Sequence, residues 1–276
     1  MLQKLRKSYK PDQSEQTQEI DSNLVDSYSV LAEIYDELMC HVDYQLWVHY
    51  ALEILGDHGL EFGYDNAASP FLECGCGTGT FALNLAFLGF DVSAFDASDS
   101  MIEIAKSKSV GLERPPKFST MRFLELNEVE RFKVAFCLYD SVNYLLNIDD
   151  LQLFFDKVKN ALIPGGMFLF DICTIFNSQR YFSNRSQIES GPDFWSERQM
   201  HYNSKTRVQE NKFSIKVDTH PGKTFTEVHQ QKLYTVREIK KLISRTGLDL
   251  LEVTDGYTRK PPNRQSLRIH FLCRKR

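Results

Sequence analysis

The sequence lacks the features that place a protein in a membrane or outside the cell. No apolar run approaches the ~18 residues that span a bilayer, and the first residues lack the hydrophobic region of a signal peptide. The six cysteines mostly lie in apolar runs, and Cys74 and Cys76 have no second Cys or His pair at zinc-binding spacing. We therefore expect a cytoplasmic protein with free thiols, no membrane partner and no metal ion.

An excess of positive charge is also missing. Lys and Arg total 33 against 37 Asp and Glu, which gives a net charge of −4. Proteins that attract nucleic acid or an anionic membrane over a distance usually carry a net positive charge. The charge balance therefore argues against a nucleic-acid partner.

Glycine, by contrast, is concentrated in residues 70–101, which read PFLECGCGTGTFALNLAFLGFDVSAFDASDSM. A short apolar run ends in Glu73, and three glycines follow at alternate positions: Gly75, Gly77 and Gly79. Glycine accepts a positive φ and leaves bare backbone against which a ligand can lie. A helical pattern and a second apolar run that ends in Asp96 complete a β-α-β unit. The stretch therefore predicts a loop that binds a cofactor.

Two cofactor patterns can be compared with this spacing. The dinucleotide fingerprint Gly-x-Gly-x-x-Gly would need a third glycine where the chain has Thr80, so the spacing argues against NAD. The pattern acid-x-Gly-x-Gly-x-Gly, from Glu73 to Gly79, instead resembles the first motif of class I S-adenosylmethionine-dependent methyltransferases. The resemblance covers nearly the whole chain from Tyr28 onward. The segment YSVLAEIYDELMCHVDYQLWVHY looks like the N-terminal helices of a bacterial small-molecule branch of that family.

The resemblance implies S-adenosylmethionine as cofactor and S-adenosylhomocysteine as product. In the family the glycine loop holds the methionyl part of the cofactor, and an acid after the second strand takes both ribose hydroxyls; Asp96 matches that position. Two carboxylate oxygens suit two vicinal hydroxyls. The residues expected to bind the cofactor are Tyr28, Tyr35, Trp47, Glu73, Gly75, Cys76, Gly77, Gly79, Asp96, Ala97, Met101, Thr120, Met121, Arg122, Leu138, Tyr139 and Asp140.

One position departs from the family pattern. An aspartate generally precedes the methionine after the third strand and accepts the adenine amino group, whereas Thr120 precedes Met121 here. A threonine hydroxyl can accept a hydrogen bond, but only as a neutral group. We therefore expect a weaker or water-mediated adenine contact, shared with the backbone of Met121 and the side chain of Arg122.

The order of patterns predicts an α/β fold with a Rossmann-like, doubly wound sheet of seven strands and a small antiparallel β lid. Residues 1–26 are expected to form a flexible tail and residues 27–66 cap helices. Residues 67–175 and 235–276 would form the cofactor-binding domain, and residues 176–234 the inserted lid. The lid should contain three strands, because three runs alternate between apolar and polar residues: Phe194–Tyr202, Arg207–Val217 and Phe225–Tyr234.

The predicted reaction is methyl transfer by in-line displacement to a small molecule enclosed between the lid and the N-terminal helices. Six lid residues are expected to contribute to the enclosure: Phe176, Tyr181, Phe182, Phe194, Trp195 and Tyr202. If the acceptor atom carries a proton, the candidate catalytic residues that could take it are His229, Tyr144 and Asp140.

Two alternative functions stay open at this point. One is methylation of a protein or RNA, for which the sequence offers a single basic cluster: Arg259, Lys260, Arg264 and Arg268. The Asn/Asp-Pro-Pro-aromatic tetrad of base-amine methylation and the Pro-Cys pair of cytosine methylation are both absent. The other alternative is a regulator that binds S-adenosylmethionine without turnover. The sequence leaves open the acceptor, the atom methylated (N, O or C), the use of a general base, and the oligomeric state.

Overall fold

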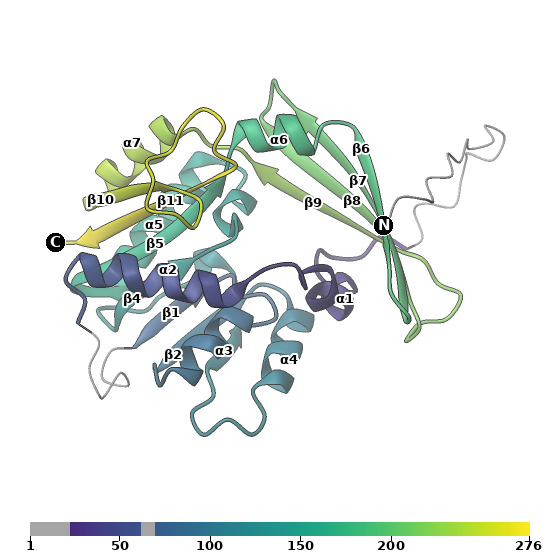
Figure 1. Cartoon of the computed structure of the whole chain (residues 1–276), viewed down its shortest axis with the longest axis horizontal. Coiled ribbons are helices and arrows are strands. Elements are labelled where there is room, and N and C mark those ends of the chain that lie inside the picture. Colours follow the sequence, from purple (N-terminus) through teal and green to yellow (C-terminus); the bar gives the residue numbers. More distant parts are fainter. Residues whose placement is uncertain (1–22, 62–69) are drawn as a thin grey trace, which may run out of the picture.

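The computed structural model describes residues 23–61 and 70–276, which form two sheets side by side (Figure 1). The first is a seven-stranded sheet with the order β10-β11-β5-β4-β1-β2-β3, and the second is a four-stranded antiparallel sheet with the order β6-β7-β8-β9. The expected fold class, a Rossmann-like sheet with an antiparallel lid, is confirmed.

The seven-stranded sheet consists of β1 (Phe71–Cys74), β2 (Val92–Asp96), β3 (Lys117–Thr120), β4 (Phe132–Cys137), β5 (Leu162–Cys173), β10 (Leu248–Asp255) and β11 (Arg268–Lys275). The strands β1 to β5 pair in parallel, while β11 runs antiparallel to both β5 and β10. The carboxyl ends of the parallel strands therefore meet at one edge of the sheet, where ligands bind in open α/β folds.

Helices cover both faces of this sheet. The helices are α1 (Leu31–Leu38), α2 (Tyr44–Asp57), α3 (Thr80–Phe87), α4 (Asp99–Lys108), α5 (Ile148–Ala161), α6 (Ile175–Tyr181) and α7 (Val236–Thr246). One apolar cluster joins α5 and α7 to the sheet, and a second joins α2, α3 and α4 to its other face. The central strands are apolar on both sides for this reason; Ala135 and Phe136 on β4 are neighbours in sequence and both fully buried. No helix in the described residues combines the length and apolarity needed to cross a bilayer.

The lid sheet consists of β6 (Arg185–Ser190), β7 (Phe194–Asn203), β8 (Val208–Val217) and β9 (Phe225–Lys232). The expectation of three strands was wrong, because β6 adds a fourth at the edge. Its sequence RSQIES is almost entirely polar and exposed, so it lacks the apolar alternation that reveals a half-buried strand.

One strand is irregular, and one boundary differs from the expectations. The turn Pro164–Gly166 lies within β5, which begins at Leu162, and it forms an irregularity where the pairing with β4 jumps. The flexible tail was expected to extend to residue 26, but Leu24 forms a parallel bridge with Thr226 of β9. Residues 1–22 lie outside the described part of the chain.

Candidate active site

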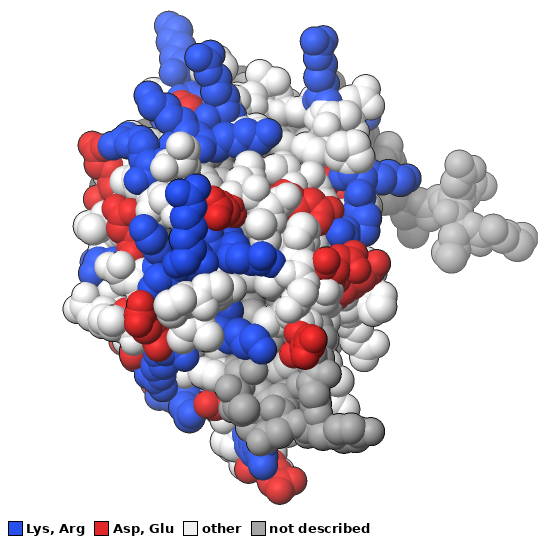
Figure 2. Space-filling view, turned by 90° about the vertical axis from the view of Figure 1, so that its left-hand side faces the viewer, with Lys and Arg blue, Asp and Glu red and all other residues white. Residues whose placement is uncertain are grey.

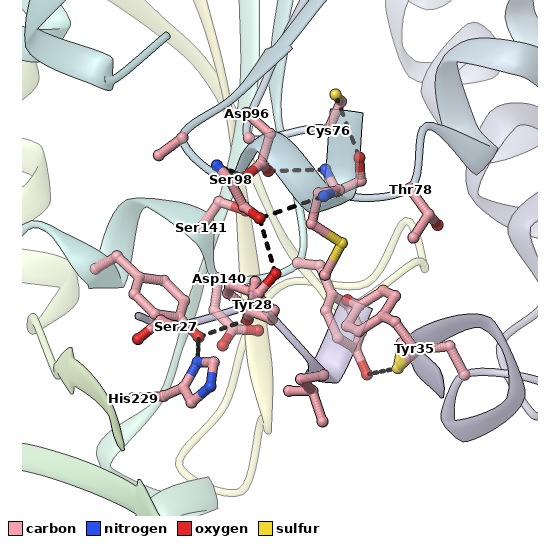
Figure 3. Close-up of a pocket in the computed structure, with 18 of the residues that line it drawn as sticks. Ser27, Tyr28, Tyr35, Cys76, Thr78, Asp96, Ser98, Asp140, Ser141 and His229 are labelled. Carbon is pink, nitrogen blue, oxygen red and sulfur yellow. Dashed lines mark hydrogen bonds between the residues drawn. The ribbon is translucent and has the colours of Figure 1, made fainter. Parts of the chain in front are cut away.

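A cavity of about 1170 Å³ lies between the carboxyl edge of the large sheet, the lid and the N-terminal segment. Figure 3 shows Asp96 and Ser98 toward one end of it, His229 toward the other, and Tyr28 and Asp140 between them. All the predicted site residues line this cavity except Gly79 and Thr120. The fold therefore brings together side chains that the sequence places up to about 200 residues apart.

The glycine loop lines the cavity with two glycines that have a positive φ. Gly77 has φ 54°, and a Cβ added there would meet only the Tyr35 ring, at 3.9 Å. Gly75 has φ 73°, and its Cβ would come within 3.1 Å of Ser141. Both positions need glycine because L-residues with side chains rarely adopt this backbone conformation. The open space beside Gly77 is what a bound cofactor requires.

Gly79 has a different reason to be glycine. It precedes α3 with φ 76°, and an added Cβ would lie 2.7 Å from the Phe118 ring and 2.9 Å from Ala105. The prediction that Gly79 contacts the cofactor is therefore corrected: its missing side chain allows the loop to pack against β3 and α4.

Asp96, at the end of β2, organises the glycine loop. Its Oδ2 accepts a hydrogen bond from the backbone N–H of Gly77 (2.9 Å), and its Oδ1 accepts one from Ser98 N–H (3.0 Å). Burial raises the pKa of Asp96, while these backbone hydrogen bonds oppose the shift. Each carboxylate oxygen keeps a second acceptor position, so a pair of ribose hydroxyls can still be bound.

Glu73 is the unsatisfied acid of the site. Its side chain is buried at the end of β1 and lines the cavity, and its Oε2 has no hydrogen-bond partner among the described residues. Burial raises the pKa of Glu73 to about 8. The ionised form of a carboxyl group buried in this way needs a cation or a hydrogen-bond donor beside it. The α-ammonium of an S-adenosylmethionine molecule would supply one, so the residues present fit this cofactor.

The adenine end of the cavity does not include Thr120. Its hydroxyl donates to Asp99 Oδ1 (2.6 Å) at the start of α4, and its side chain is exposed. Met121 and Arg122 do line the cavity, and Met121 N–H donates to the carbonyl of Asp96 (2.9 Å). Any adenine contact on this side therefore comes from the residues after Thr120, which corrects the prediction for that position.

Two further predicted residues, Met101 and Trp47, line the cavity mainly as part of its packed wall. Met101 is almost fully buried at the start of α4, whose N-terminus is capped by Ser98. Trp47 stacks on Tyr257 with ring centroids 4.8 Å apart and is 6% exposed. These contacts give Trp47 a core role in addition to any contact with the cofactor.

The loop after β4 carries two consecutive left-handed residues, Tyr139 (φ 59°) and Asp140 (φ 54°). Buried Asp171 holds the loop by accepting hydrogen bonds from both backbone N–H groups. Arg268 then bridges Asp171 and Asp140, and Gln231 donates to the other oxygen of Asp140. Both oxygens of Asp140 are thus occupied, so the geometry favours a structural role for it over proton transfer.

His229, on lid strand β9, belongs to a chain of hydrogen bonds that links Glu227 to Tyr144 and Tyr28. Its Nδ1 lies 3.2 Å from the Tyr144 hydroxyl, which lies 2.6 Å from the Tyr28 hydroxyl. Its Nε2 lies 3.0 Å from Glu227 Oε2. Burial raises the pKa of both tyrosines, so they stay protonated at neutral pH. Of the catalytic candidates, His229 and Tyr144 are in direct contact.

Glu227 was not among the predicted residues, although the sequence contained a signal for it. In the β9 sequence FTEVHQQK, alternate residues share one face, so Glu227, His229 and Gln231 point the same way, and all three are buried. Three polar residues at a spacing of two on the buried face of a strand indicate a site rather than a core.

The sheet order, the glycine loop and the carboxylate beyond β2 agree with the S-adenosylmethionine-dependent methyltransferase that the sequence predicts. The comparisons with known proteins support this assignment. A family model described as "Methyltransferase domain" matches residues 71–166.

Three similar proteins extend the agreement to most of the chain. A predicted methyltransferase of Bacillus subtilis (strain 168), YqeM, is 28% identical over 250 residues, which cover 90% of this chain and 97% of the relative. The crystal structure of an S-adenosylmethionine-dependent methyltransferase from Clostridium acetobutylicum is 27% identical, covers 90% of this chain and 98% of its own, and superposes with a TM-score of 0.77. The sugar N-methyltransferase KedS8 from Streptoalloteichus shares the fold (14% identity, 98% and 100% coverage, TM-score 0.67).

Proposed function

We propose that this enzyme methylates a small polar molecule that binds between the lid and the glycine loop. The observation that carries the proposal is the composition of the lid's inner face. Five of its buried residues are polar and line the cavity: Ser196, Gln209, Asn211, His229 and Gln231. A sheet that merely covered a core would bury apolar residues there. Gln231 already donates to Asp140 and Asn211 accepts from Arg198, and the remaining donor and acceptor positions of these side chains suit a polar acceptor.

The aromatic lid residues contribute less than the sequence suggested. Of the six expected to enclose the acceptor, only Phe182 lines the cavity. Trp195 lies on β7 next to Ser196, so its side chain points to the other face, where Lys216 lies over its ring. The acceptor chamber is therefore more polar than expected.

Arg198 gives the chamber a positive charge. Its guanidinium lies over the rings of Phe182 (4.9 Å) and Phe213 (5.3 Å), and its Nε donates to Asn211 (3.1 Å). Within residues 23–61 and 70–276 no carboxylate lies within ion-pair distance of it. Its terminal nitrogens can bind an acidic or oxygen-rich group of the acceptor. KedS8, described as a sugar N-methyltransferase, shows that this fold can serve an oxygen-rich acceptor.

The bound cofactor supplies an electrophilic methyl group on a sulfonium, so the protein has to bind, orient and exclude water rather than create a reactive group. Asp96 and the backbone at Gly75 and Gly77 would hold the ribose and methionyl parts, and Glu73 the ammonium. Tyr28 and Tyr35 line the cavity beside the glycine loop. Tyr144 and His229 would take the proton that the acceptor loses when it attacks.

A macromolecular acceptor has less support. Of the basic cluster that suggested it, Arg268 is paired inside the protein, and Arg259 is paired with Asp57 and Glu252. Figure 2 shows Lys and Arg interspersed with Asp and Glu on the face that lies away from the lid. We also propose a cytoplasmic location, which the six free cysteines support.

The test has two stages. Isothermal titration should show binding of S-adenosylmethionine and S-adenosylhomocysteine and none of NAD. Production of S-adenosylhomocysteine should then be measured with matched acceptors, such as amino sugars, neutral sugars and small amines, each with and without a carboxylate or phosphate. Turnover with one of these, reduced in Arg198→Met but not in the surface variant Lys212→Met, is expected. Binding without turnover across the panel would support the regulator; turnover only on protein or RNA would reverse the proposal.

A further inference from the structure

Glu227 connects the lid to the N-terminal segment that covers the cavity. Its side chain is fully buried on β9. Its Oε2 accepts a hydrogen bond from the backbone N–H of Tyr28 (2.6 Å), and its Oε1 accepts from the backbone N–H groups of Val30 (2.7 Å) and Leu31 (2.8 Å). No Lys or Arg lies within ion-pair distance of it in the described part of the chain. One carboxylate therefore accepts from three backbone N–H groups within Tyr28–Leu31 of the covering segment, residues 23–31.

The same carboxylate contacts His229, with 3.0 Å between Glu227 Oε2 and His229 Nε2. A carboxylate can only accept, so this contact requires the proton of neutral His229 to be on Nε2. The Nδ1 lone pair then faces the Tyr144 hydroxyl at 3.2 Å. Glu227 thus sets both the tautomer and the orientation of the imidazole.

The covering segment is also connected to the cofactor end of the cavity. Tyr28 has φ 64°, a strained value for a residue with a side chain, and its N–H is bound by Glu227. In this conformation the Tyr28 carbonyl accepts a hydrogen bond from Ser98 Oγ (2.8 Å), next to Asp96. Its hydroxyl at the same time contacts Tyr144 (2.6 Å). The position of Tyr28 therefore affects both ends of the cavity.

We propose that Glu227 is a positioning residue that couples the seating of residues 23–31 over the cavity to proton transfer through His229, an inference that rests on the proposed function. As the acceptor atom forms its bond to the methyl carbon, its proton passes to the Tyr144 oxygen while the Tyr144 proton passes to His229 Nδ1. The electron pair of the broken carbon–sulfur bond stays on sulfur. The imidazolium that forms is stabilised by Glu227 only when that carboxylate is in place.

The charged and titratable groups around His229 are few. Tyr28 and Tyr144 face it with ring centroids 4.5 and 6.3 Å away, and Phe213 packs on it at 5.2 Å. Asn211 is its register partner on β8, and Glu227 is its only carboxylate contact among the described residues. The tautomer of His229 therefore depends directly on its contact with Glu227.

The experiment is ¹⁵N NMR of histidine-labelled protein, with and without S-adenosylhomocysteine, together with amide hydrogen exchange. The ¹⁵N signals of His229 are identified by their loss in His229→Gln. They are expected to show a neutral imidazole that is protonated on Nε2 and unprotonated on Nδ1. In Glu227→Gln the tautomer should change or become mixed, because the amide has one acceptor oxygen for four donors. The Val30 and Leu31 amides should also exchange about tenfold faster or more. The control Glu210→Gln, on the outer face of β8, should change neither.

These readouts separate a positioning role from a purely structural one. In His229→Gln the amides of Val30 and Leu31 should stay protected, and in Tyr144→Phe His229 should keep its proton on Nε2. If the wild-type protein carried this proton on Nδ1, the proposal would be overturned, even if Glu227→Gln did not fold. Retention of both tautomer and protection in a folded Glu227→Gln protein would overturn it as well. None of these signals requires turnover, so they stand apart from the outcome of the acceptor panel.

Discussion

The cofactor end and the acceptor end of the cavity are built in different ways. The cofactor end uses the backbone of a single short stretch: Gly75, Gly77 and Asp96 lie within one β-α-β unit. The acceptor end uses side chains from separate lid strands and from the N-terminal segment, joined by contacts such as that between Tyr28 and Glu227, 199 residues apart. A common cofactor can be held by local geometry, whereas the acceptor is selected by side chains that the fold has to assemble.

The two ends also differ in what they contribute to stability. The sheet behind the glycine loop is packed with apolar residues on both faces. The inner face of the lid instead buries amides, a carboxylate and an imidazole. Buried polar groups add little stability even when they are paired. The lid's inner face is therefore better explained by ligand binding than by folding, and changes at the two ends should have separable effects.

The largest effect is expected from Asp96→Ala. The change removes the acceptor for two backbone N–H groups of the loop and the proposed ribose contact. Since hydrogen bonds to a charged group contribute about 1.5–3 kcal/mol each, S-adenosylhomocysteine should bind at least about a hundredfold more weakly by isothermal titration.

Two control variants test whether the cofactor end and the acceptor end of the cavity act separately. Asp91→Asn removes a surface ion pair with Lys117 and should leave affinity unchanged. Asn211→Ala, at the acceptor end, should change the affinity for S-adenosylhomocysteine less than about threefold, because it contacts Arg198 and not the cofactor loop. Equal losses in the Asp96 and Asn211 variants would show that the two ends are not separate.

The next effect concerns Glu73→Gln and depends on pH. The pKa of Glu73 is about 8 in the folded protein against an ordinary value of 4.5. Between pH 4.5 and pH 8, Glu73 is ionised in the unfolded chain but still protonated in the folded protein. The contribution of Glu73 to the free energy of unfolding therefore falls as the pH rises from 4.5 to 8. Without cofactor, Glu73→Gln should therefore be more stable than wild type at pH 8, by up to about 4 kcal/mol, and nearly equal at pH 4.5.

The affinity of Glu73→Gln for S-adenosylhomocysteine should fall at pH 8, where its stability should rise. Glutamine cannot form an ion pair with the α-ammonium, so at pH 8 the affinity for S-adenosylhomocysteine should fall by about tenfold or more. Thermal melts and titration at pH 5, 6.5 and 8 measure both effects. A variant that lost stability at pH 8 while binding as tightly as wild type would contradict this account of Glu73.

Alanine variants of Gly79 and Gly77 should separate the residue that the glycine loop needs for packing from the one that it needs for binding the cofactor. Gly79→Ala places a Cβ against Phe118 and Ala105 at a positive φ and should destabilise the protein by about 2 kcal/mol. Gly77→Ala meets open space, so about 1 kcal/mol of backbone strain is expected. Its methyl group lies in the proposed cofactor position, however, so S-adenosylhomocysteine affinity should fall more for Gly77→Ala. Urea unfolding and titration with S-adenosylhomocysteine, done on both variants, test whether Gly79 serves packing and Gly77 serves cofactor binding.

The sequence predicted the cofactor end better than the acceptor end, for physical reasons. The spacing from Glu73 to Gly79 and the acid at Asp96 are local, and their strands could be placed from apolar runs alone. Spacing could not show which way a missing Cβ would point, so Gly79 was assigned to the cofactor. On the lid, the inward-facing residues depend on strand register, which pairs His229 with Asn211 and is fixed only by the fold.

The smallest effect is expected at Thr120, the position that departs from the family pattern. Its hydroxyl is bound to Asp99, and its side chain lies outside the cavity. Thr120→Ala should therefore change the affinity for S-adenosylhomocysteine less than about twofold, which corresponds to under about 0.4 kcal/mol. Thr120→Asp would restore the residue type that the resemblance implies, but it would place a second carboxylate against Asp99, so no gain in affinity is expected. A clear gain in the affinity of Thr120→Asp for S-adenosylhomocysteine would mean that a side chain at the end of β3 binds the adenine. The cofactor end would then depend on side chains, as the acceptor end does.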